Sequence, residues 1–166
     1  ISRVFVDAVK ALPSDLYNRL RIFHQCRLED RKFIKTVYDD LGIKSEIEVF
    51  FNDLGKRLAE SHLIISRAGA STVSEICIVG RPSVLIPLPT ALGNHQFLNA
   101  VSMEKTGGAK LANQRSLTGE HLSEEIILLL SDSNKLREMA SSALNNGKPD
   151  AARGLAENIV QFSLEG

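Results

Sequence analysis

Residues 63–88, LIISRAGASTVSEICIVGRPSVLIPL, decide the fold. Two short apolar stretches, LIIS (63–66) and SVLIPL (83–88), are typical of strands that are buried on both faces. The ten residues STVSEICIVG (71–80) between them have the length of a helix and end in a glycine, which is common just beyond a helix end. The stretch therefore predicts a β–α–β unit, and the crossover through the helix makes its two strands parallel.

The alternation of strand and helix continues on both sides of this unit. Strands that alternate with helices of about ten residues favour a doubly wound α/β fold, a Rossmann-like parallel sheet with helices on both faces. The expected strands are RLRIFHQ (19–25), EIEVFF (46–51) and AKLA (109–112), and the expected helices are residues 1–11, 29–42, 52–61, 95–107, 119–131, 133–145 and 149–162, the last with Pro149 at its start.

Length and composition restrict the class of protein. With 166 residues and 43% hydrophobic side chains, the chain is expected to form one domain, residues 1–166, around one core. Its 20 basic and 20 acidic side chains cancel, so no net charge favours nucleic acid or an anionic membrane. No apolar run approaches about 20 residues, and no signal peptide precedes the first helix, so we predict a cytoplasmic protein. Cys26 and Cys77 are predicted to be buried thiols, and neither a metal nor a cofactor is expected.

The first residues predict a domain that is truncated at its amino-terminal side. A doubly wound fold normally begins with a strand whose following loop and helix N-terminus bind phosphate. In this sequence the helical pattern already starts at Ile1. We therefore expect that a first strand and its glycine-rich turn are missing.

The densest group of candidate site residues is SRAGASTVSE (66–75), directly after the LIIS strand. Gly69 and Ala70 permit close approach of a ligand to the backbone. The helix that is expected to begin near Ser71 directs its free N–H groups and its positive dipole end at the turn. This arrangement suits a diphosphate.

Glu75 has two interpretations of equal weight. A carboxylate about one turn into the helix can accept hydrogen bonds from both hydroxyls of a ribose. Alternatively, Thr72 and Glu75 form a capping box, which needs no ligand. Arg67, just before the glycine turn, is a weaker candidate: it could neutralise a diphosphate, or it could pair with Asp53 or Glu75.

A second group of polar residues follows the next predicted strand, in PLPTALGNHQFLNA (87–100). It lies at the carboxyl end of that strand, the edge where open α/β sheets bind ligands. Asn94, His95 and Gln96 place amide and imidazole groups at the start of a helix, where they could read sugar hydroxyls. The pattern alone favours the alternative that Asn94 caps the helix and His95 is solvated.

Three stretches taken together resemble the carboxyl-terminal domain of the MurG family, the bacterial transferases that add N-acetylglucosamine to lipid I to form lipid II for peptidoglycan. They are SRAGASTVSEICIVGRPSVLIPLP (66–89), NHQFLNA (94–100) and MEKTGGAKLA (103–112). The resemblance covers most of the chain. It implies one half of a GT-B glycosyltransferase, in which two Rossmann-like domains face a cleft and this domain holds the donor, UDP-N-acetylglucosamine.

The resemblance also implies which residues bind the nucleotide. Ala70, Ser71 and Thr72 would contact the diphosphate, beside Gly69, and Glu75 would bind the ribose hydroxyls. The whole enzyme would be an inverting hexosyltransferase, in which a hydroxyl of lipid I attacks the anomeric carbon and displaces UDP.

The resemblance also implies contacts to the sugar and to the base. The resemblance implies that Gln96, helped by His95, reads hydroxyls of the N-acetylglucosamine ring. Phe51 and Leu54 would lie against the uracil, with main-chain hydrogen bonds from Phe51. The loop ALGNHQ (91–96) lacks an acidic residue that many relatives place just before NHQ, so this sequence departs from the family at the sugar.

The family's amino-terminal domain is absent from this sequence. In the family it supplies the lipid I site, the proposed histidine base and the membrane-facing surface. The resemblance therefore implies a full-length protein that is peripheral on the cytoplasmic face of the bacterial inner membrane. The fragment alone is expected to be inactive, with no catalytic residue of its own, and to bind its donor weakly without the glycine-rich loop.

Three other functions are compatible with parts of the pattern. A UDP-N-acetylglucosamine 2-epimerase shares some of these motifs but needs an acid and a base of its own. A separately encoded donor subunit would dock on a membrane partner. A flavodoxin-like signalling domain should carry a phosphorylatable Asp at a strand end, whereas Asp39, Asp40 and Asp53 fall in predicted helices or helix starts.

Overall fold

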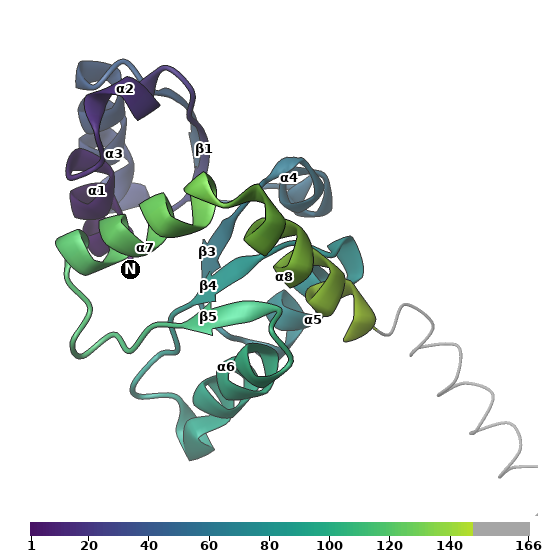
Figure 1. Cartoon of the computed structure of the whole chain (residues 1–166). Coiled ribbons are helices and arrows are strands. Elements are labelled where there is room, and N and C mark those ends of the chain that lie inside the picture. The colour runs from purple at the N-terminus through teal and green to yellow at the C-terminus, as the bar shows by residue number, and fades with distance from the viewer. Residues whose placement is uncertain (148–166) are drawn as a thin grey trace, which may run out of the picture.

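The strands of this protein pair in parallel and alternate with helices, as the sequence predicts. The computed structural model describes residues 1–147 (Figure 1), so the helix expected from Pro149 lies outside the described residues. In chain order the elements are α1 (Ser2–Lys10), α2 (Ser14–Tyr17), β1 (Arg21–Gln25), α3 (Leu28–Asp40), β2 (Lys44–Glu48), α4 (Leu54–Glu60), β3 (Ile64–Ser66), α5 (Ala70–Val79), β4 (Ser83–Leu85), the 3-10 turn η1 (Leu92–Asn94), α6 (His95–Lys105), β5 (Ala109–Leu111), α7 (Gly119–Ser131) and α8 (Ser133–Asn145).

The strands form two hydrogen-bonded groups. β1 pairs with β2, from Arg21 opposite Lys44 to Gln25 opposite Glu48, and β3, β4 and β5 pair in that order. The predicted α/β class, with parallel strands flanked by helices, is confirmed. Within residues 1–147 the five strands are divided between these two groups, and no hydrogen-bonded pairing joins β1 or β2 to β3.

Helices cover both faces of the three-stranded group. Consecutive side chains of a strand point to opposite faces. Accordingly, Val84 and Ile86 pack in the core cluster to which α7 contributes, whereas Leu85 packs in the cluster to which α5 and α6 contribute. Figure 1 shows α7 and α6 on opposite sides of β4 and β5. All of these strand residues are fully buried, which accounts for the continuous apolar runs in the sequence.

Helix α1 connects the two groups of strands. Its Val6 and Val9 pack in the cluster with Ile34 of α3 and the side chains of β1 and β2. Its Ala8 packs in the cluster with Leu122 of α7 and the side chains of β4. The same short helix therefore contributes buried surface to both groups.

The second strand ends three residues earlier than predicted. β2 stops at Glu48 instead of Phe51, because its partner β1 ends at Gln25, directly opposite Glu48. Beyond that point the Phe51 N–H donates to the side chain of Gln25 instead of to a strand. The short helix α2 was not predicted either; it follows Pro13, whose fixed φ suits a helix start.

The two long helices near the end of the described chain have the predicted bounds. α7 is capped by the Thr118 hydroxyl, which accepts from the His121 N–H. α8 is capped by the Asp132 carboxylate, which accepts from the N–H groups of Asn134 and Lys135. Side-chain caps of this kind place the helix starts where the sequence indicates them.

Two predictions from composition can also be compared with the structure. Cys26 and Cys77 are free and buried, as expected. Within residues 1–147, no helix is both long enough and apolar enough to cross a bilayer.

The contact between α1 and α7 is expected to tolerate no side chain at Gly119. A Cβ at Gly119 would lie 2.7 Å from the Asp7 Cβ and 2.9 Å from the Asp7 carbonyl carbon. Gly119→Ala should therefore lower the free energy of unfolding by about 1–3 kcal/mol, measured by chemical denaturation. Gly55, in helix α4, is the matched control because a Cβ there meets nothing within 4 Å. Gly55→Ala should leave stability unchanged or raise it by up to about 1 kcal/mol, and equal stability of the two variants would contradict this packing.

Candidate functional site

The start of α5 presents free backbone donors at the carboxyl ends of the strands. The helix begins at Ala70 with Gly69 in the N-cap position, and no side chain within the described residues caps it. The first backbone hydrogen bond of the helix runs from the Val73 N–H to the Gly69 carbonyl. The N–H groups of residues 70–72 therefore have no partner in this part of the chain, which leaves the helix end open to an anion.

The capping-box interpretation of Thr72 and Glu75 is wrong. Because α5 begins at Ala70, Thr72 lies inside its first turn and cannot be the cap. The Glu75 carboxylate is exposed, and within residues 1–147 it takes part in no hydrogen bond or ion pair. It remains free to accept hydrogen bonds from a ligand.

Arg67, in the loop that follows β3, forms hydrogen bonds with the loops that follow β4 and β5. Its Nη1 donates to the carbonyls of Ile86 and Pro87, at 3.1 and 3.3 Å, and to Oε1 of Gln114 at 2.5 Å. The predicted alternative of a salt bridge to Asp53 or Glu75 is wrong, since Asp53 instead pairs with Arg57 at 3.1 Å.

The electrostatic consequence of this arrangement is a positive charge among the loops that follow β3, β4 and β5. Burial lowers the pKa of the Arg67 guanidinium, but arginine stays protonated in proteins. The hydrogen-bond acceptors of Arg67 are neutral, and no carboxylate of residues 1–147 forms an ion pair with it. A negative ligand is therefore favoured at this turn.

Two amides on one face of α6 position the neighbouring loops. Gln96 Oε1 accepts from the Leu88 N–H at 2.9 Å, and Asn99 Nδ2 donates to the Ala68 carbonyl at 3.0 Å. The N–H and C=O of a trans peptide point in opposite directions. By holding the Ala68 carbonyl toward α6, Asn99 directs the Gly69 N–H away from α6. Sequence reasoning missed Asn99, although its spacing of three residues from Gln96 places both on one helix face.

Asn94 and His95 are exposed at the start of α6. Asn94 occupies the N-cap position with a left-handed φ of 55°, and its side chain makes no cap bond. The alternative is thus right about the N-cap position of Asn94 and the exposure of His95, but wrong about a cap by the Asn94 side chain. The His95 ring folds back over Gly93, where a Cβ would lie 2.8 Å from its Nε2.

The residues expected at the uracil are largely buried. The Phe51 side chain is only 6% exposed, and Leu54 packs partly buried against the core. The Phe51 N–H donates to Gln25 Oε1 at 3.2 Å. The exposed aromatic ring of this loop belongs to Phe50, at 66%, which sequence reasoning did not single out.

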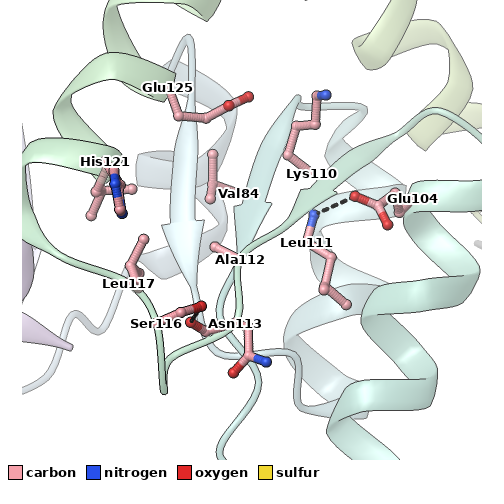
Figure 2. A pocket seen from close by; sticks show the side chains of 11 residues that line it. Val84, Glu104, Lys110, Leu111, Ala112, Asn113, Ser116, Leu117, His121 and Glu125 are labelled. Carbon is pink, nitrogen blue, oxygen red and sulfur yellow. Dashed lines mark hydrogen bonds between the residues drawn. The ribbon is translucent and has the colours of Figure 1, made fainter.

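Two cavities lie beside strand β5, which contributes Leu111 to the lining of both. Figure 2 shows the first, about 290 Å³, between the start of α7 and the edge strand β5. His121 and Glu125 of α7 border it, and Glu104 closes the strand edge by accepting from the Leu111 N–H at 2.9 Å. Neither cavity is lined by residues 69–75. Of the predicted site residues only Asn94 reaches one of them, the second cavity, whose volume is about 300 Å³ and whose lining comprises Pro87, Leu88, Pro89, Asn94, Phe97, Leu111, Asn113, Gln114 and Arg115.

Comparison with known proteins identifies relatives over nearly the whole chain. A protein from Chelativorans sp. (strain BNC1) named UDP-N-acetylglucosamine--N-acetylmuramyl-(pentapeptide) pyrophosphoryl-undecaprenol N-acetylglucosamine transferase is 46% identical over 94% of this chain and 42% of its own length. A protein of the same name from Paramagnetospirillum magneticum is 42% identical over 96% of this chain and 43% of its own length. The crystal structure of Acinetobacter baumannii MurG superimposes with a TM-score of 0.81 and 32% identity over 94% of this chain and 44% of that chain.

These matches concern one part of longer proteins. The chain spans less than half the length of the curated relatives named above. The family model described as the glycosyltransferase family 28 C-terminal domain matches residues 2–155. The chain therefore belongs to the glycosyltransferase family 28 C-terminal domain family.

Proposed function

We propose that this chain is the donor-binding part of an inverting N-acetylglucosaminyltransferase that converts lipid I to lipid II. Its relatives with 40–46% identity carry the name of that transferase. Its donor would be UDP-N-acetylglucosamine. Within residues 1–147 the last residues of the strands are Gln25, Glu48, Ser66, Leu85 and Leu111, so no strand described there ends in the aspartate of a signalling domain.

The start of α5 is the observation that carries this proposal. Three unpartnered N–H groups, the charge of Arg67 and the free carboxylate of Glu75 lie within ten residues of one another in the sequence. A diphosphate bound by the helix end would place its ribose about one turn along the helix, where Glu75 accepts from the hydroxyls. No other helix in residues 1–147 combines an uncapped start, a glycine N-cap and an unpaired carboxylate one turn on.

The same groups would contribute to catalysis in the whole protein. When the acceptor hydroxyl attacks the anomeric carbon, the bond to the diphosphate breaks and negative charge grows on the leaving UDP. N–H groups of the helix start that are already directed at this charge would stabilise the transition state more than the ground state. The acceptor site, the base that takes the hydroxyl proton and contact with the cytoplasmic face of the membrane would belong to the rest of the protein.

Calorimetric titration tests the proposed donor. We expect UDP-N-acetylglucosamine and UDP-glucose to bind the chain weakly, and GDP-mannose to bind at least about tenfold more weakly, because the base site accepts a single-ring base. Equal affinity for the three nucleotides would exclude a uridine-specific donor site.

Incubation of the full-length protein with UDP-N-acetylglucosamine alone separates a transferase from an epimerase. The sugar should stay unchanged when no acceptor is present. Conversion to another sugar isomer under these conditions would support the epimerase instead.

A further inference from the structure

We propose that the Gln25 side chain is a placeholder for the nucleobase. Its amide oxygen accepts the hydrogen bond of the Phe51 N–H until a carbonyl of the base replaces it as acceptor. This inference rests on the proposed function, because it assumes that a uridine nucleotide binds beside Phe51. The observation behind it is the hydrogen bond of 3.2 Å from the Phe51 N–H to Gln25 Oε1. It joins the carboxyl end of β1 to the loop that follows β2.

Phe51 does not depend on Gln25 for its position. Its ring is buried and packs edge-to-face against Phe23, with ring centroids 6.5 Å apart. Arg57 lies 5.7 Å from the Phe51 ring and 4.8 Å from the Phe23 ring, and it is itself held by Asp53. The backbone N–H is thus directed by the packing of the ring and remains in place when its acceptor changes.

Gln25, in contrast, is held only weakly. It is exposed at the last position of β1, and the bond from Phe51 is the only hydrogen bond of its side-chain amide within the described residues. A bond from a backbone N–H to an exposed amide contributes little net stability, since water competes for both groups. A ligand carbonyl can therefore replace the amide oxygen at low cost.

The exchange selects bases by their hydrogen-bonding edge. A carbonyl, such as O4 of uracil, can accept from the Phe51 N–H in place of Gln25. The amino group at the same position of cytosine is a donor, so it cannot replace the amide oxygen. A cytidine nucleotide would have to leave Gln25 in place or leave the N–H without a partner, and both outcomes weaken its binding.

Substitution of Gln25 in the complete 166-residue chain tests the inference. Gln25→Leu keeps the size of the side chain and removes the acceptor, and Gln25→Asn keeps the amide but is one methylene too short to reach Phe51. Without nucleotide, the Phe51 amide should exchange its hydrogen several-fold faster in both variants than in the unaltered chain. UDP should bind both variants about three- to tenfold more tightly, whereas CDP affinity should stay within about twofold. NMR titration measures affinities in the weak range expected.

The outcomes separate this inference from the proposed function. An equal gain for UDP and CDP, a loss of UDP affinity, or unchanged exchange of the Phe51 amide would overturn the placeholder role while leaving uridine binding intact. Absence of UDP binding to the unaltered chain would overturn the proposed donor, and the placeholder role with it.

Discussion

Glu75→Ala is expected to lower the affinity for UDP-N-acetylglucosamine by about 10- to 100-fold. Hydrogen bonds from a carboxylate to two ribose hydroxyls are charge-assisted, and such bonds contribute about 1.5–3 kcal/mol. Glu75 is exposed and unpaired within residues 1–147, so its loss should not disturb the fold. Calorimetric titration of the variant and the unaltered chain measures the effect.

Glu124→Ala is the matched control for Glu75. Glu124 is also an exposed helical carboxylate, but it lies on α7, outside the turn at the start of α5. Both substitutions remove one negative charge, so a difference between them reports position and not net charge. If Glu75→Ala bound the donor as tightly as Glu124→Ala, the ribose role of Glu75 would be refuted.

Acidification should destabilise this protein through His24 by about 2–3 kcal/mol between pH 7 and pH 4.5. His24 is 7% exposed, and its Nδ1 lies 2.8 Å from the Tyr38 hydroxyl oxygen. Burial lowers the pKa of His24 from 6.5 to about 4, against an opposing effect of Asp30. At pH values between about 4 and 6.5 the unfolded chain therefore carries a proton on His24 that the folded chain lacks. The contribution of neutral His24 to stability is lost as the pH falls through this range.

Two variants isolate this contribution from the carboxylates that titrate in the same range. His24→Asn removes the titrating ring and offers the Tyr38 hydroxyl an amide partner. The loss of stability between pH 7 and pH 4.5 should therefore be about 2–3 kcal/mol smaller in this variant than in the unaltered chain. Tyr38→Phe removes only the hydroxyl and should keep the steep dependence, since burial is the main cause of the shift. Denaturant unfolding at pH 7 and pH 4.5 gives the comparison. Parallel pH curves for His24→Asn and the unaltered chain would exclude His24 as the source.

The fold was predictable where hydrophobic pattern and length agree. Residues 83–87 of SVLIPL are buried, and in LIIS Ile64 is buried while its neighbours are half-buried. The helices of residues 119–131 and 133–145 have side-chain caps that the sequence already displays. The end of β2 was not predictable, because it depends on where β1 ends, a contact between residues 23 positions apart. The division of the strands into two groups is likewise a tertiary property, which local periodicity does not contain.

The candidate site was predictable in its composition but not in its internal contacts. Gly69, Thr72 and Glu75 fit a phosphate turn and a capping box equally well, and only the observed helix start at Ala70 separates the two. The partners of Arg67 come from loops about 20 and 47 positions away, so its neutral surroundings could not be foreseen. The partner of Gln25 could not be predicted, because the backbone N–H of Phe51 has no sequence signature.

Helix α1 determines how the molecule loses its structure. Its buried residues are shared between the core of β1 and β2 and the core of β4 and α7, so opening either half exposes apolar surface on the same helix. Neither group of strands can therefore unfold without lowering the stability of the other. The β1–β2 group and the β3–β4–β5 group are therefore expected to unfold as one cooperative unit, although within residues 1–147 no backbone ladder runs between them.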